Sequence, residues 1–257
     1  MKKVIFTAIL ALSVLGFTSC NKDVEPIEFT PQATLAINVS DLMMYGLANV
    51  FGYVELISAK IAKGETIDES IVVESDGSGW STEFADNQTF KGKISVLFNG
   101  SPLDDGAKKQ VDCSETKLRI PNSNTEIPLF GEFDITNIST SSSETSRSVI
   151  TNQFGWGDAT NNAYIDAVYE FNTNILSTGE ISECKISGYA TGNHVQYGHF
   201  SQTIITDLNV GYVFFKSGSM VLSAASIGAG LPIEVYFNSA GMYGITIQFN
   251  GEQPISY

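Results

Sequence analysis

The run YIDAVYEFN, residues 164–172, decides the fold class of this chain. Its side chains alternate with a period of two, so that one side of the run carries Tyr164, Asp166, Val168 and Glu170. This pattern is typical of a β-strand with one buried face, because successive side chains of a strand point to opposite faces. The run therefore predicts a strand in a sheet that has a core side and a solvent side.

Similar stretches, rich in Val, Ile, Phe and Tyr, lie on both sides of this run. Turn signals separate them about every 8–12 residues, which is the spacing expected of a β-sandwich. We predict further strands at 33–39, 71–73, 94–98, 117–120, 132–135, 180–191, 194–206, 211–216, 232–237 and 244–249. The predicted class is all-β, an antiparallel β-sandwich of immunoglobulin-like type.

Residues 41–62 are ambiguous between helix and strand. Ser40 and Asp41 could cap a helix over residues 42–62 with one polar side. However, two glycines interrupt this stretch, and Val50–Val54 is rich in residues that favour strands. We favour a strand from about residue 50 to 61.

Residues 136–148, TNISTSSSETSRS, contain nine Ser or Thr and a single Ile. A stretch with so few apolar side chains adds little to a core, so it is expected to be a loop or linker. We therefore predict two β-sandwich domains, at residues 32–137 and 149–257, joined by a linker at 138–148.

The N-terminus carries a targeting pattern. Lys2 and Lys3 precede an apolar run, residues 4–17, that ends at Thr18-Ser19-Cys20. This run is shorter than the ~20 apolar residues of a membrane-spanning helix and is typical of a signal peptide.

The pattern, with Lys22 and the acidic residues that follow it, resembles the signal region of Bacteroidota lipoproteins. On this resemblance residues 1–19 are a signal peptide, Cys20 carries the lipid, and residues 20–31 form a tether. The resemblance implies an outer-membrane lipoprotein, exposed at the cell surface or else facing the periplasm. Its membrane contact would be the lipid on Cys20.

Charge and motifs exclude several classes of function. Fourteen Lys and Arg oppose 28 Asp and Glu, giving a formal net charge of −14, which disfavours nucleic acid as a partner. The chain has no nucleophile motif, phosphate loop or dinucleotide fingerprint. We therefore predict no catalytic residues and no cofactor.

Cysteines and histidines also predict no metal site, because no ligand pair has the spacing of a zinc motif. His194 and His199 are five residues apart, which places them on opposite faces of a strand. Cys113 and Cys184 could pair in an oxidising compartment or remain two buried thiols.

Two tryptophans are the candidate ligand contacts. Trp80 has Asp86 and Asn87 beyond it, and Trp156 is followed by Asp158 and Asn161. A sugar needs a flat apolar surface for its C–H groups and carboxylates or amides for its hydroxyls. The alternative is that each Trp closes one end of a core. Neither stretch has the ligand spacing of a calcium loop.

The sequence thus predicts a non-enzymatic, lipid-anchored β-protein that binds a polysaccharide. The alternative is a structural or adhesive subunit, associated with fimbriae, that contacts other surface-assembly proteins. A sugar binder should expose an aromatic ring beside amides and carboxylates. An assembly subunit should instead present an unpaired edge strand or a donor strand.

Overall fold

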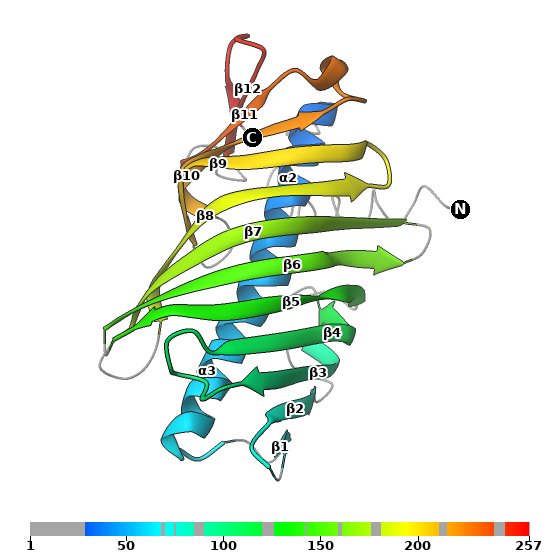
Figure 1. The fold of residues 1–257 in the computed structure, drawn as a ribbon. Coiled ribbons are helices and arrows are strands. Elements are labelled where there is room, and N and C mark those ends of the chain that lie inside the picture. Colours follow the sequence, from blue (N-terminus) through cyan, green and yellow to red (C-terminus); the bar gives the residue numbers. More distant parts are fainter. Residues whose placement is uncertain are drawn as a thin grey trace, which may run out of the picture.

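A long helical segment lies across one face of a thirteen-stranded antiparallel sheet in the computed structural model (Figure 1). The structure describes residues 29–67, 70–74, 76–84, 90–119, 126–141, 143–158, 161–175, 181–210, 215–238 and 245–256. The predicted signal peptide, the predicted lipidation site Cys20 and most of the predicted tether lie outside these residues.

The strands pair in the order in which they occur in the chain, each antiparallel to the next. They are β1 (Ile71–Val73), β2 (Gly79–Phe84), β3 (Phe90–Asn99), β4 (Lys108–Arg119), β5 (Glu126–Thr140), β6 (Glu144–Asp158), β7 (Asn161–Ile175), β8 (Ile181–His194), β9 (Gly198–Val210), β10 (Phe215–Ala224), β11 (Ile233–Asn238), β12 (Ile245–Phe249) and β13 (Ile255–Ser256). The all-β prediction is confirmed, since strands dominate and most of those predicted between residues 71 and 249 lie in this sheet.

The predicted division into two sandwiches is wrong for the described chain. The stretch predicted as a linker, 138–148, forms the ends of β5 and β6, with Thr140 opposite Thr145. Its Ser and Thr side chains contribute little apolar burial, but their backbone groups continue the ladder between these two strands. A hairpin therefore carries one sheet through the region where we expected a boundary.

The predicted strands at 33–39 and 50–61 are also wrong, because both stretches are helical. The helical segment comprises α2 (Pro31–Asp41), the π-helical η2 (Leu42–Ala48) and α3 (Asn49–Lys63). Thr30 caps its start by accepting the backbone N–H of Ala33 at 3.2 Å, and Pro31 occupies the first turn. Gly64 ends it in the left-handed conformation, at φ 66°.

Burial explains why the helical period was hidden. Every residue of α2 from Leu35 to Ser40 is buried, and the preceding Thr34 is half-buried. No polar side therefore marks this helix in the sequence. Gly46 has a packing role, because a Cβ at this position would come within 3.1 Å of the Phe154 ring. The glycine lets the helical segment approach β6 closely.

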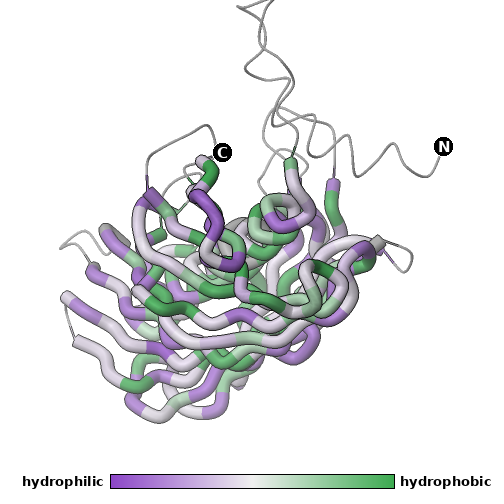
Figure 2. Tube along the Cα trace, turned by 90° about the horizontal axis from the view of Figure 1, so that it is seen from above, coloured by the Kyte–Doolittle hydropathy of each residue, from purple (hydrophilic) through white to green (hydrophobic). Residues whose placement is uncertain are grey.

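The core lies between the helical segment and the sheet. Phe51 of α3 contacts Phe171 of β7 with ring centroids 4.3 Å apart. Hydrophobic and hydrophilic residues alternate along the strands when the molecule is viewed from above (Figure 2). We call the face of the sheet that packs on the helices the inner face and the opposite face the outer face.

Candidate functional site

Trp80 belongs to the core, which makes the predicted sugar contact at this residue wrong. It lies on the inner face of β2 with 1% of its surface exposed. Its indole N–H donates to the Ser58 hydroxyl of α3 at 3.2 Å, and its ring meets Tyr53 edge-on. The Trp therefore ties the sheet to α3, as the core alternative expected. Asp86 and Asn87, its predicted partners, lie outside the described residues.

The second predicted group is brought together at the ends of β6 and β7. Asp158 lies directly opposite Asn161, and Trp156 lies opposite Ala163. Asp158 is exposed, whereas Trp156 is half-buried and packs against the core. The three residues are neighbours, but the indole is not an open surface for a sugar ring.

The outer face carries an apolar row that the sequence did not single out. Ile150 of β6, Val168 of β7 and Tyr189 of β8 lie directly opposite one another on adjacent strands. Ile205 follows on β9, two residues after Thr203, the partner of Tyr189. All four are exposed, and Tyr189 shows 58% of its surface. We call these four residues the outer stripe.

Polar residues border the outer stripe on both sides. On one side Glu170 lies opposite Ser187. On the other, Asp166 lies opposite Thr191, which in turn lies opposite Ser201. An exposed phenol ring thus stands among carboxylates and hydroxyls. The ring and the carboxylates are the features we expected of a sugar contact, whereas hydroxyls stand where amides were also expected.

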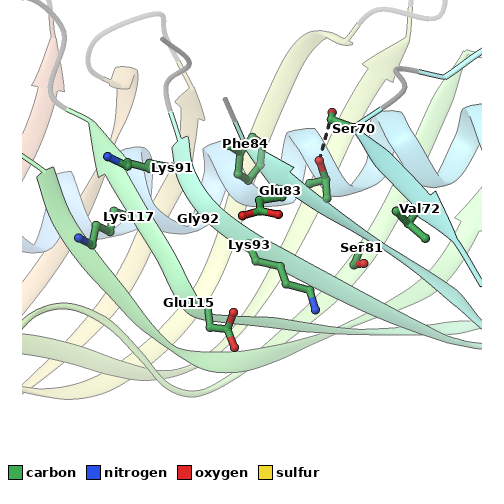
Figure 3. Close-up of a pocket in the computed structure, with 11 residues that line it drawn as sticks. Ser70, Val72, Ser81, Glu83, Phe84, Lys91, Gly92, Lys93, Glu115 and Lys117 are labelled. Atoms are coloured by element: carbon green, nitrogen blue, oxygen red, sulfur yellow. Dashed lines mark hydrogen bonds between the residues drawn. The ribbon is translucent and has the colours of Figure 1, made fainter. Parts of the chain in front are cut away.

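A hollow of about 920 Å³ lies at the other end of the same face, over β1 to β4 (Figure 3). Lys93 of β3 stands between Glu83 of β2 and Glu115 of β4 in the strand register. Figure 3 shows these three side chains on the face turned away from the helix. Further along β3 and β4, Lys91 lies directly opposite Lys117. One half of the hollow therefore carries both acidic and basic side chains, and the other half carries two lysines.

A second charged group is buried on the inner face. Glu55 of α3 contacts Lys109 of β4 at 2.7 Å and Arg147 of β6 at 2.8 Å, and both cations are 1% exposed. Lys109 also donates to the Asn137 amide oxygen at 2.9 Å. Burial lowers the pKa of Lys109, and the Glu55 carboxylate opposes that change. This buried charge cluster joins α3 to two strands and presents no open surface for a ligand.

The two histidines do not share one strand, as the prediction assumed, because His194 ends β8 and His199 lies at the start of β9. His194 is buried on the inner face and His199 is exposed. The backbone N–H of Gln196 donates to His194 Nδ1 at 3.1 Å. On the other side of the ring, the side-chain amide nitrogen of Asn38 in α2 lies 3.0 Å from His194 Nε2. Burial lowers the pKa of His194 to about 4, so the ring is neutral at pH 7.

Cys113 and Cys184 are two free thiols, the second of the alternatives. Burial raises the pKa of both. Within the ranges that the structure describes, no three His, Cys, Asp or Glu side chains gather in a way that could hold a metal ion. None of the described helices is both long and apolar enough to cross a membrane.

Comparison with known proteins found no matching family model, no matching curated protein and no matching solved structure.

Proposed function

We propose that this chain is a non-enzymatic, lipid-anchored protein of the outer membrane, exposed at the cell surface, that binds a glycan on the outer face of its sheet. One observation carries the proposal, namely the exposed Tyr189 in the outer stripe between two polar rows. The lipid anchor rests on the sequence pattern that ends at Cys20.

The physical case concerns what a sugar can gain at a protein surface. Each hydroxyl contact replaces a hydrogen bond to water, so its net contribution is small. Apolar contact between a ring face and sugar C–H groups contributes on the order of 25 cal/mol per Å² buried. Tyr189 offers such a face, with the neighbouring Val168 and Ile205 extending the apolar area. Asp166, Thr191 and their neighbours supply the polar partners.

The alternative, a subunit assembled through its sheet edges, has less support. Partner strands add best to a long, unpaired edge. Here the described sheet ends in β1, with three residues, and β13, with two. Such short edges offer few backbone groups to a partner strand.

A retention assay on immobilised polysaccharides tests the proposal. The wild type should be retained by at least one polysaccharide of a broad panel, and Tyr189→Ala should lose that retention with an unchanged melting temperature. Tyr236→Ala is the matched control, because Tyr236 is an exposed tyrosine of β11 on the same face. If the wild type binds nothing on the panel, or if both variants behave alike, the proposal fails.

The anchor is tested separately by fractionation. Cys20→Ala should release the protein from membranes, whereas the wild type should incorporate labelled fatty acid. A Cys20→Ala variant that still sediments with the outer membrane would contradict lipidation at this residue.

A further inference from the structure

Three stretches of the sequence contain no Asp, Glu, Lys or Arg, namely residues 29–40, 186–206 and 217–233. In the fold they form most of α2, most of β8, β9 and β10, and the two turns that join β8 to β9 and β10 to β11. Figure 1 shows the start of α2 beside this end of the sheet. We call the three stretches together the uncharged region.

Contacts between side chains and backbone join these stretches. The Asn38 amide nitrogen of α2 lies 3.0 Å from His194 Nε2 at the end of β8. The His194 ring stacks on Tyr197 in the β8–β9 turn, with ring centroids 4.9 Å apart. The Ser226 hydroxyl, in the β10–β11 turn, donates to the Tyr197 carbonyl. The two turns therefore lie side by side, next to α2.

The β10–β11 turn presents apolar side chains on a backbone that is paired within the turn. Leu231 is 39% exposed, and Val195 of the neighbouring turn is 45% exposed. The N–H groups of Ile227, Gly230 and Leu231 donate to carbonyls of the turn itself or of the last residue of β10. An unpaired N–H is costly to move out of water, so this pairing suits the turn to an apolar environment.

The predicted tether limits the distance between α2 and the membrane. Phe29 is nine residues after Cys20, and an extended chain spans at most about 3.6 Å per residue, so Phe29 lies within about 32 Å of Cys20. The helical segment, residues 31–63, extends from there over about 50 Å towards β1 to β3 (Figure 1). The uncharged region is therefore at the end of the molecule that the tether holds near the bilayer.

We propose that the β10–β11 turn, with Val195 beside it, lies on the lipid surface to which Cys20 is anchored. The proposal rests on the lipid anchor of the proposed function and adds how the protein sits on the membrane. Leu231 and Val195 enter the boundary between headgroups and acyl chains, where apolar side chains are buried from water.

Charge indicates which lipid this contact takes. The chain has a net charge of −14, so anionic headgroups repel most of its surface. Asp158 of β6 and Glu234 of β11 border the uncharged region and add no attraction to such headgroups. The partner is therefore a surface of neutral, zwitterionic phospholipid. Tyr189 lies six residues before Val195 on β8, or about 20 Å along the strand, so the outer stripe remains free for a glycan.

Quenchers carried by lipid test this contact. A fluorophore is attached to Leu231→Cys in the full-length protein, which is reconstituted into phosphatidylcholine vesicles with or without headgroup nitroxide. Emission should fall about twofold with nitroxide, because a side chain at the boundary lies within about 10 Å of the headgroups. Leu97→Cys is the matched control, a leucine of β3 that is 55% exposed, and its emission should not change. The wild type, with free thiols at Cys113 and Cys184, gives the background labelling.

Hydrogen exchange provides a second measurement that needs no substitution in the contact. Amides between residues 225 and 231 should exchange more slowly in the wild type on vesicles than in the wild type in solution. Amides between residues 100 and 107, in the turn between β3 and β4, should exchange alike in both states.

Incorporation of labelled fatty acid by the wild type separates this inference from the anchor. Quenching at position 231 and not at 97 in a lipidated protein supports the contact. Quenching at neither position, or at both, overturns the contact and leaves the anchor in place. If the protein carries no lipid, quenching at 231 alone still supports the contact and contradicts only the anchor, whereas no quenching overturns both. A blue shift at 231 without quenching indicates a protein partner and also overturns the inference.

Discussion

On β7, Tyr169 and Phe171 of the inner face are at most 1% exposed, whereas Val168, which directly precedes Tyr169, is 39% exposed on the outer face. The inner face is closed by the helical segment and is stabilised by aromatic contacts and one buried charge cluster. The outer face remains open, and it carries the outer stripe. Substitutions on the inner face should therefore change stability, whereas those on the outer face should change binding.

The largest effect should come from Trp80→Ala. Removing a fully buried indole that also donates to Ser58 should cost about 3–5 kcal/mol of stability, which a urea titration would measure. Trp156→Ala is the comparison, and it should cost less because Trp156 is half-buried. Equal losses of stability in the two variants would contradict the assignment of Trp80 to the core and of Trp156 to its periphery.

The buried charge cluster should be nearly as sensitive. Glu55→Gln keeps the shape of the side chain but leaves Lys109 and Arg147 without their counter-charge, at a cost of about 3 kcal/mol. Glu65→Gln removes an exposed partner of Lys63 and should cost about 1 kcal/mol or less. Denaturant titration of both variants would show whether the stability of the fold depends on the buried contacts of Glu55.

Acid should lower the free energy of unfolding because His194 is buried in its neutral form. Because the pKa of the folded state is about 4 and the ordinary value is near 6.5, only the unfolded chain takes up this proton between those pH values. Stability should therefore fall as the pH drops, by roughly 2 kcal/mol from this group between pH 7 and pH 5. His194→Gln should reduce this dependence. If His199→Gln, at the exposed ring, removes it instead, the assignment is wrong.

Proteolysis tests whether the sheet is continuous at the β5–β6 hairpin. Arg147 is 1% exposed and donates both to Glu55 and to the Ser139 carbonyl, so trypsin should leave the bond after it intact under native conditions. Mass spectrometry of the early fragments would check this. Early cleavage after Arg147, leaving two resistant halves, would restore the two-domain prediction.

Strand signals were predictable from the sequence, but their assembly was not. The alternation at 164–172 indicated both the strand and its two faces, and β7 has them as predicted. The helical segment was not predicted because most of α2 is buried, so α2 lacks the polar side that normally marks a helix in a sequence. Its ends were nonetheless visible as Thr30-Pro31 and Gly64, the residues that favour helix starts and stops.

The candidate site was predicted in kind but not in place. The sequence predicted an aromatic residue beside carboxylates and amides, and it favoured the two tryptophans because they lie in Gly-rich stretches with such residues. Tyr189 lies inside a predicted strand, and only the register of β7, β8 and β9 shows what borders it. The pairing of Lys91 with Lys117 likewise depends on register, which a sequence without known pairings does not specify.

Comparing Tyr189→Ala with Tyr189→Phe, on the polysaccharide that best retains the wild type, tests whether the ring of Tyr189 binds a glycan. If the outer face binds a glycan through an aromatic ring, Phe should preserve most of the retention and Ala should abolish it. Both variants should melt within about 2 °C of the wild type, because surface substitutions usually change stability by less than about 0.5 kcal/mol. Retention that survives in Tyr189→Ala, or that is lost equally in both variants, would contradict glycan binding through the ring of Tyr189.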